Sequence, residues 1–64
     1  MIKYHVYANG GNVHMVFEAT EHPLAVKRAK ELAEEFGQAL IEGTSPDGKY
    51  IYSSFTMNDR GEWI

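Results

Sequence analysis

The alternation of apolar and polar residues around the Asn9-Gly10-Gly11-Asn12 segment is the strongest constraint on the fold of this chain. Such alternation is typical of strands with one buried face, and an Asn/Gly segment between two such runs predicts a hairpin with glycine at positive φ. If Asn9 lies opposite Asn12, every apolar residue of one face meets an apolar partner, whereas a slip of one residue would mix the two faces. The predicted pairs are Ile2 with Ala19, Tyr4 with Phe17, Val6 with Met15 and Ala8 with Val13 on one face, and Lys3 with Glu18, His5 with Val16 and Tyr7 with His14 on the other.

Helical spacing replaces this alternation after Thr20. Pro23 suits the first turn of a helix, Thr20 or His22 is the expected N-cap, and Gly37 is the expected residue just past the end. Small and apolar residues then share one stripe about 100° wide. The stripe contains Ala25, Ala29, Leu32, Ala33 and Phe36, and the opposite side carries Lys27, Lys30, Glu31 and Glu34. We therefore expect an amphipathic helix that packs on one face of a sheet.

A second hairpin is predicted from residues 38–44 and 49–56, joined by the turn Ser45-Pro46-Asp47-Gly48. Placing Ser45 opposite Lys49 predicts its register. In that register Ala39 faces Phe55, Ile41 faces Ser53 and Gly43 faces Ile51. A further turn at residues 58–61 leaves residues 62–64 either as a short fifth strand or as a segment that packs Trp63 on the rim of the core.

These elements predict an α+β domain of ββαββ order, a hairpin, a helix and a hairpin, with the helix on one face of a four-stranded sheet. This order resembles the β-grasp architecture, which implies that the first and last strands lie parallel at the centre of the sheet. A plain antiparallel ββαββ sheet, with the tail as a fifth strand, is the alternative. The expected core combines both periodicities. It consists of Ile2, Tyr4, Val6, Val13, Met15, Phe17, Ala25, Ala29, Leu32, Phe36, Ile41, Ile51 and Phe55.

The composition narrows the class of protein. A chain of 64 residues has room for a single domain, 1–64, with one small core, and self-association would add to its marginal stability. The absence of cysteine excludes a disulfide framework, and the cytoplasm is the expected compartment. Neither an export signal nor an apolar run near the roughly 20 residues of a membrane helix is visible, so we expect a soluble protein without a membrane partner.

Catalytic and metal-binding patterns are weak. Ser45, Ser53 and Ser54 lie outside any nucleophile-elbow pattern, and the glycines at 10 and 11 connect two strands rather than a strand and a helix, so an enzyme is not expected. His5 and His14 should lie diagonally on one face, about 7 to 8 Å apart. Because no third ligand has a suitable spacing, we expect surface histidines and neither a metal nor another cofactor.

The face opposite the helix is the best candidate for function, because alternation places large aromatic and apolar side chains where solvent is expected. If the first and last strands are neighbours, the aromatic residues form one continuous patch, and such patches mark interaction sites. The candidate binding residues are His5, Tyr7, His14, Val16, Tyr50 and Tyr52, and Leu40 lies on the same face.

Two functions fit this face. The first is a protein-binding module that uses the open sheet face or an edge strand, of the kind that phage and mobile elements encode as small inhibitors or adaptors; its partner is another protein or a second copy of the chain. The second is a single-strand nucleic-acid binder whose exposed aromatic rings stack on bases. Six Lys and Arg against nine Asp and Glu give a net charge of −3, which opposes contact with phosphates, so nucleic acid is the less favoured partner.

Overall fold

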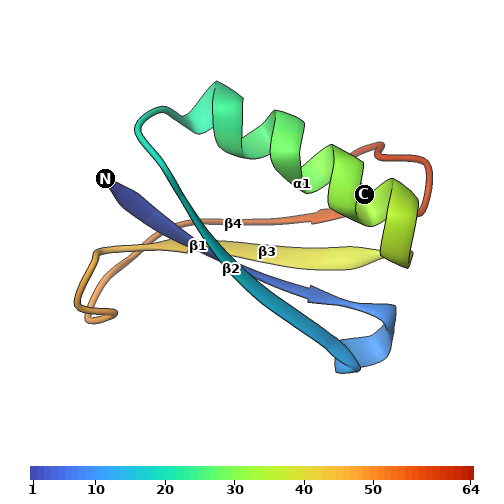
Figure 1. Cartoon of the computed structure of the whole chain (residues 1–64), viewed down its shortest axis with the longest axis horizontal. Helices are drawn as coiled ribbons and strands as arrows, with labels where there is room; N and C mark the ends of the chain where they lie inside the picture. Colours follow the sequence, from blue (N-terminus) through green and yellow to red (C-terminus); the bar gives the residue numbers. More distant parts are fainter.

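The computed structural model describes all 64 residues of the chain. The elements follow one another as β1 (Ile2–Ala8), the 3₁₀ turn η1 (Asn9–Gly11), β2 (Val13–Ala19), α1 (His22–Phe36), β3 (Ala39–Thr44) and β4 (Ile51–Met57). Figure 1 shows the helix lying across one face of the four strands. The predicted ββαββ order and the α+β class are confirmed.

The strand order is β2-β1-β3-β4, and every neighbouring pair is antiparallel. The β-grasp arrangement, with the first and last strands parallel at the centre, is therefore wrong. The alternative is correct in that all four strands are antiparallel, but the tail adds no fifth strand. The short connection after the helix explains this order. Gly37 and Gln38 return the chain to the end of β1, where the Asn9 amide donates to the Gln38 carbonyl at 3.2 Å. The next strand must then run back along β1, with Ala8 opposite Ala39.

The register of the first hairpin is the predicted one at all of its seven pairs, from Ile2 opposite Ala19 to Ala8 opposite Val13. The turn between the strands is left-handed, with φ of 53° at Asn9, 66° at Gly10 and 90° at Gly11. Asparagine and glycine are the residues that adopt this region at least cost. In this hairpin the alternation of residues and the Asn/Gly turn predict the same register that the structure shows.

The helix begins at His22 and ends at Phe36, with Pro23 in its first turn and Gly37 directly after it at φ 102°. Its N-cap is Glu21, whose side chain makes no capping hydrogen bond, so the expectation of Thr20 or His22 at this position is wrong. Four residues of the predicted stripe are buried against the sheet. They are Ala25, Ala29, Leu32 and Ala33. Because three of them are alanines, the helix can approach the strands closely.

The second hairpin is paired two residues away from the predicted register, so that Ile41 faces Phe55 and Gly43 faces Ser53. The turn is longer than expected because the Ser45 amide bonds to the Tyr50 carbonyl at 2.9 Å. Hydrogen bonds from the Ser45 hydroxyl and the Lys49 amide hold this turn and lower the pKa of the Asp47 carboxyl. Since Thr44 faces Ile51, residue Tyr52 has no partner and forms a bulge in β4.

The core lies between the helix and the sheet. Its buried residues are Tyr4, Val6, Ala8, Ala19, Ala25, Ala29, Leu32, Ala33, Ala39, Ile41 and Met57. Two predicted core residues are wrong: Ile51 is 63% exposed, because the bulge turns it away from the helix, and Phe36 is 37% exposed, because it ends the last helical turn. The predicted core omitted several buried alanines and Met57, which lies opposite Ala39 in the observed register.

The partial exposure of Phe36 predicts a modest cost for its removal. We expect Phe36→Ala to lower the free energy of unfolding by about 1 to 2 kcal/mol, because only part of the ring is taken out of water. A fully buried phenylalanine would cost about 3 to 5 kcal/mol. Urea denaturation followed by circular dichroism measures the difference, and a loss above about 3 kcal/mol would contradict the exposed position of this ring.

The C-terminal tail follows the second predicted arrangement, in which Trp63 packs on the rim of the core. The Asn58 carboxamide oxygen accepts hydrogen bonds from the Arg60 and Glu62 amides, each at 2.9 Å, and closes the turn. Trp63 then forms a single β-bridge with Met57 and packs its ring 4.7 Å from that of Phe55. Residues 62–64 are therefore not a fifth strand.

Candidate functional site

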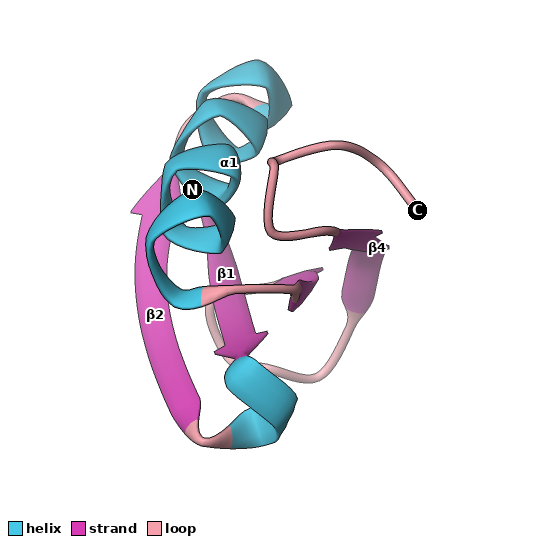
Figure 2. Ribbon diagram, turned by 90° about the vertical axis from the view of Figure 1, so that its right-hand side faces the viewer, coloured by secondary structure: helices cyan, strands magenta, loops and turns pink.

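The outer face is the sheet surface that faces away from the helix. Figure 2 shows the helix and the C-terminal tail on the other side of the strands. The pairing brings the outward residues into three rows across the sheet. These rows are His14-Tyr7-Leu40-Thr56, Val16-His5-Glu42-Ser54 and Glu18-Lys3-Thr44-Ile51. The one α-helix of the chain lies on the other side of the sheet from these rows (Figure 1).

Three aromatic rings stack at the β1 and β2 side of this face. The rings of Tyr7 and His14 lie 4.6 Å apart and within 8° of parallel, because the two residues are directly opposite in the hairpin. His5 is the diagonal neighbour, and its ring lies 5.9 Å from that of His14. The predicted proximity of the two histidines is confirmed. Stacking restricts the orientation of these three rings.

His5 is held from a second side by β3. Its Nε2 lies 3.4 Å from the Thr44 hydroxyl, and its Nδ1 is buried without a hydrogen-bond partner. A buried polar nitrogen without a hydrogen-bond partner lowers the free energy of unfolding. The His5 ring is therefore held by contacts with His14 of β2 and Thr44 of β3, whereas the His14 side chain is exposed.

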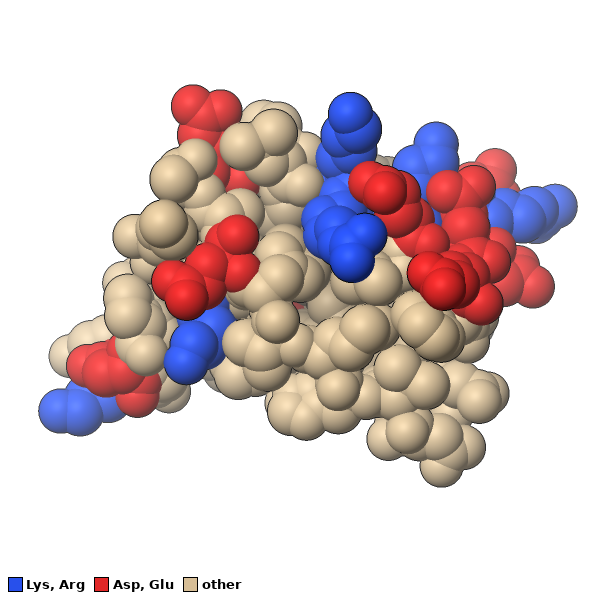
Figure 3. Space-filling view, viewed as in Figure 1, with Lys and Arg blue, Asp and Glu red and all other residues tan.

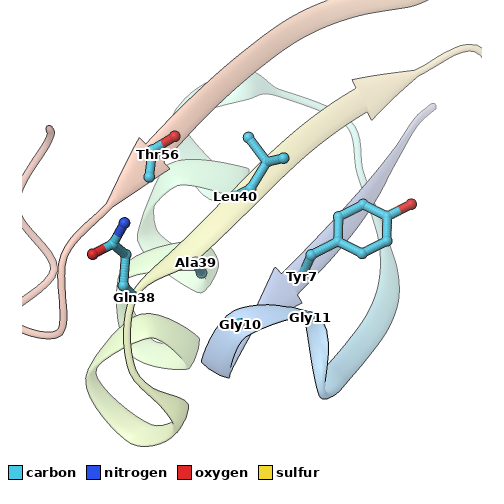
Figure 4. Close-up of a pocket in the computed structure, with 7 residues that line it drawn as sticks. All are labelled: Tyr7, Gly10, Gly11, Gln38, Ala39, Leu40 and Thr56. Atoms are coloured by element: carbon cyan, nitrogen blue, oxygen red, sulfur yellow. The ribbon is translucent and has the colours of Figure 1, made fainter.

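A hollow of about 480 Å³ opens beside Tyr7 at the end of the sheet near η1. Figure 4 shows Tyr7, Leu40 and Thr56 projecting from the neighbouring strands β1, β3 and β4 around it. The other residues that line it are Gly10, Gly11, Gln38 and Ala39. Tyr7 is its single titratable side chain, and the remaining lining offers apolar surface, one amide and one hydroxyl. The hollow can accept an apolar or aromatic side chain of a partner.

The centre of the outer face contains no Lys, Arg, Asp or Glu apart from Glu42. Val16 is 48% exposed and Leu40 is 40% exposed, on either side of the His5 and Tyr7 strand. The charges lie toward one end, where Lys3 is opposite Glu18. One positive and two negative groups leave the face with a small net negative charge.

Tyr50 and Tyr52 lie apart from the ring stack. Both are well exposed, at 64% and 59%, but they sit beside and on the bulge of β4, and β3 separates β4 from β1. The expectation of one continuous aromatic patch required β1 and β4 to be neighbours, and that premise is wrong. The structure brings His5, Tyr7, His14 and Val16 together and leaves Tyr52 of β4, and Tyr50 just before it, at the far edge of the sheet.

Sequence reasoning missed the residues that complete the hollow, above all Gln38 and Thr56. Thr56 faces Leu40 in the observed register, whereas the predicted register placed Ser54 there. The missing signals were the length of the second turn and the bulge. Closing the turn on Tyr50 shifts the register by one residue, and the unpaired Tyr52 shifts it by one more, so that Thr56 lies opposite Leu40.

No group of three or more His, Asp or Glu side chains is arranged to hold a metal ion. His22 lies on the helix side of the sheet, where its Nδ1 is 3.2 Å from the Tyr4 hydroxyl, far from the pair formed by His5 and His14. The one helix of the chain falls short of the length and apolar character needed to cross a membrane.

In comparisons with known proteins, no family model, no curated protein and no solved structure matches this chain.

Proposed function

We propose that this chain is a protein-binding module that uses its outer face, in the manner of a small adaptor or inhibitor that occupies a surface of its partner. The observation that carries this proposal is the stacked group of Tyr7, His14 and His5 beside an open hollow, with Val16 and Leu40 exposed around it. Orientated aromatic rings and exposed apolar side chains are the usual anchors of protein interfaces.

The chemistry of the face favours a partner segment without strong charge. Tyr7 and Leu40 border the hollow, so an apolar or aromatic side chain of the partner would bury itself between them. The face covers strands of six or seven residues and a width of four strands, or about 24 Å by 19 Å, roughly 450 Å². This flat outline is smaller than the accessible surface of the side chains that stand on it, and buried area does not by itself set affinity.

Substitution of Tyr7 tests this proposal. Tyr7→Ala should weaken binding of the captured partner by about 2 kcal/mol, or roughly 30-fold in Kd, because it removes both the ring stack and one wall of the hollow. Capture from lysate identifies the partner, and calorimetric titration then gives the Kd of each variant. Tyr52→Ala in the same series shows whether the interface extends to the edge at β4.

Glu34→Ala is the matched control, because Glu34 is exposed on the helix, on the opposite side of the molecule. Tyr52→Ala and Glu34→Ala should keep their melting temperature within about 5 °C of the parent, since exposed positions shift stability by well under about 1 kcal/mol. Tyr7 is half-buried, so Tyr7→Ala should melt somewhat lower and still be folded. A Tyr7→Ala variant that is folded and binds the partner as tightly as the parent would contradict the proposal.

The ring stack also resembles the platforms on which single-stranded nucleic acids lie, and a titration separates this second function from the first. Fluorescence anisotropy with mixed single-stranded DNA and RNA should show no binding at low salt, because Glu18 and Glu42 outnumber Lys3 on the outer face. Micromolar binding with a steep dependence on salt would favour nucleic acid instead.

A further inference from the structure

The two edges of the sheet differ in how well they are protected from pairing with another strand. At the β4 edge, the bulge at Tyr52 interrupts the strand, and the tail pairs with its end through the Met57 and Trp63 bridge and the Ile64 amide, which donates to the Thr56 carbonyl at 3.0 Å. Bulges and covering segments are common means by which proteins prevent edge-to-edge pairing. The β4 edge is therefore closed over part of its length.

The β2 edge has none of these features. Its pairing with β1 is regular from Val13 to Ala19, without a bulge, and the strand contains no proline and no lysine. Figure 3, viewed with β2 in front, shows the charged side chains over the helix and at the left, while the lower right surface near η1 shows none. The inward residues Val13, Met15 and Phe17 are only half-buried. A strand added at this edge would cover them.

We propose that β2 pairs in antiparallel fashion with β2 of a second copy of this chain, with the two-fold axis at Val16, to form one eight-stranded sheet. This register pairs all seven residues of the strand, because Val16 is its midpoint. In this register each odd-numbered residue of β2 lies opposite an odd-numbered residue of the second copy. The odd-numbered side chains point toward the helix, so both helices lie on the same face of the joined sheet. Met15 then packs beside Phe17 of the second copy. A register shifted by a single residue would oppose the apolar face of one copy to the outer face of the other.

The polar side chains support this register. With Val16 on the axis, His14 of each copy lies opposite Glu18 of the other, which places an imidazole next to a carboxylate twice in one interface. Within each copy Glu18 already has Lys3 on its other side, and His14 has Tyr7 stacked upon it. An imidazole N–H can donate a hydrogen bond to a carboxylate directly opposite, and such polar pairs across strands stabilise a sheet. Moving the axis to Met15 or Phe17 would remove both pairs.

A second hollow, of about 370 Å³, lies between the end of β2 and the start of the helix, lined in part by Phe17, Ala19 and Leu24. In the paired register Val13 of the second copy lies opposite Ala19, so an apolar side chain arrives beside this hollow. Pairing also joins the two outer faces into one continuous surface of twice the extent. The dimer does not depend on binding by the outer face.

Cysteine cross-linking tests the axis directly, because the chain has no cysteine of its own. Residues directly opposite in an antiparallel pair have Cα atoms about 4.5 to 5.5 Å apart, within the range of a disulfide. Val16→Cys should therefore cross-link to itself at least about tenfold faster than Leu40→Cys, a control of similar exposure in the middle of the sheet. Equal rates for the two variants would overturn the proposal.

The register is tested by two further variants. His14→Cys should not cross-link with itself, because the two copies of residue 14 lie about 13 Å apart, four residues along the strand. A mixture of His14→Cys and Glu18→Cys should cross-link readily across the pair. Self-linking of His14→Cys without linking in the mixture would show a different register and contradict the axis at Val16.

Charge exchange gives an independent measurement on the cysteine-free chain. By sedimentation equilibrium the parent should approach twice its monomer mass as concentration rises, and Glu18→Lys should raise the dimer Kd at least about tenfold. The double variant His14→Glu with Glu18→Lys should restore dimerisation, whereas the matched control Glu34→Lys should leave it unchanged. Thermal melts verify folding. A parent that stays monomeric, or folded Glu18→Lys that dimerises like it, would overturn the proposal.

Discussion

Tyr4→Ala should lower the free energy of unfolding by about 3 to 5 kcal/mol, the largest effect expected of a single substitution in this chain. Tyr4 is completely buried between the helix and the sheet. Its ring stacks on that of Phe17 at 5.4 Å, lies against Gly43, and bonds through its hydroxyl to Nδ1 of His22 at 3.2 Å. Removal of the ring leaves a cavity at the point where β1, β2, β3 and the helix meet.

A domain of this size has roughly 3 to 10 kcal/mol of stability in total, so the variant should be largely unfolded or melt at least about 12 °C below the parent. Circular dichroism during heating and in urea measures both quantities. Tyr4→Phe is the matched control and should cost only about 0.5 to 1.5 kcal/mol, because it keeps the ring and loses one hydrogen bond to an exposed histidine. Folded Tyr4→Ala that melts within a few degrees of the parent would contradict this packing.

The same burial gives the Tyr4 hydroxyl a dependence on pH. Loss of contact with water raises the pKa of Tyr4 above its ordinary value of 10.0. The contribution of this group to stability is therefore complete below the pKa of an unfolded tyrosine and is lost as the pH rises through the raised pKa of the folded state. In Tyr4→Phe this part of the alkaline loss should be absent.

Gly43→Val should lower the free energy of unfolding by about 3 kcal/mol, at the upper end of the usual cost of overpacking. A Cβ atom at this position would lie 2.8 Å from Cε1 of Tyr4 and 2.8 Å from the Ser53 hydroxyl. Both neighbours are held in place, since Tyr4 is buried and Ser53 is paired with Gly43 in β4. Valine normally stabilises a strand relative to glycine, so a loss of stability in Gly43→Val would indicate the close contact with Tyr4 and Ser53.

Leu40→Val is the matched control on the same strand, because its side chain is 40% exposed on the outer face and meets no such obstruction. It should change stability by less than about 1 kcal/mol. In the double variant Tyr4→Leu with Gly43→Val, the two costs should not add, because the smaller side chain relieves the contact. Gly43→Val with the stability of the parent or higher would show that the strands can separate at this point without cost.

Much of the candidate site was predictable because it lies in the first hairpin. Alternation and the Asn9–Asn12 turn act over a few residues, and they placed His5, Tyr7, His14 and Val16 on one face in the correct pairs. The other half of the site belongs to the second hairpin, where the longer turn and the bulge shifted the register between β3 and β4. The Ser45 turn closes on Tyr50 rather than on Lys49, and Tyr52 bulges out of β4, which turned Ile51 outward and brought Thr56 beside Leu40.

What the sequence determined by itself is local: the elements, the register of the first hairpin and the buried stripe of the helix all follow from periodicity and from residues such as Gly10, Pro23 and Gly37 that favour a turn or a helix end. Only the tertiary structure decided which strands are neighbours. Hydrophobic alternation says which face of a strand is buried, but it is the same for every order of strands. The short return at Gly37 and Gln38 places β3 beside β1, sends β4 to one edge and leaves β2 at the other, and this order sets which side chains of the outer face meet.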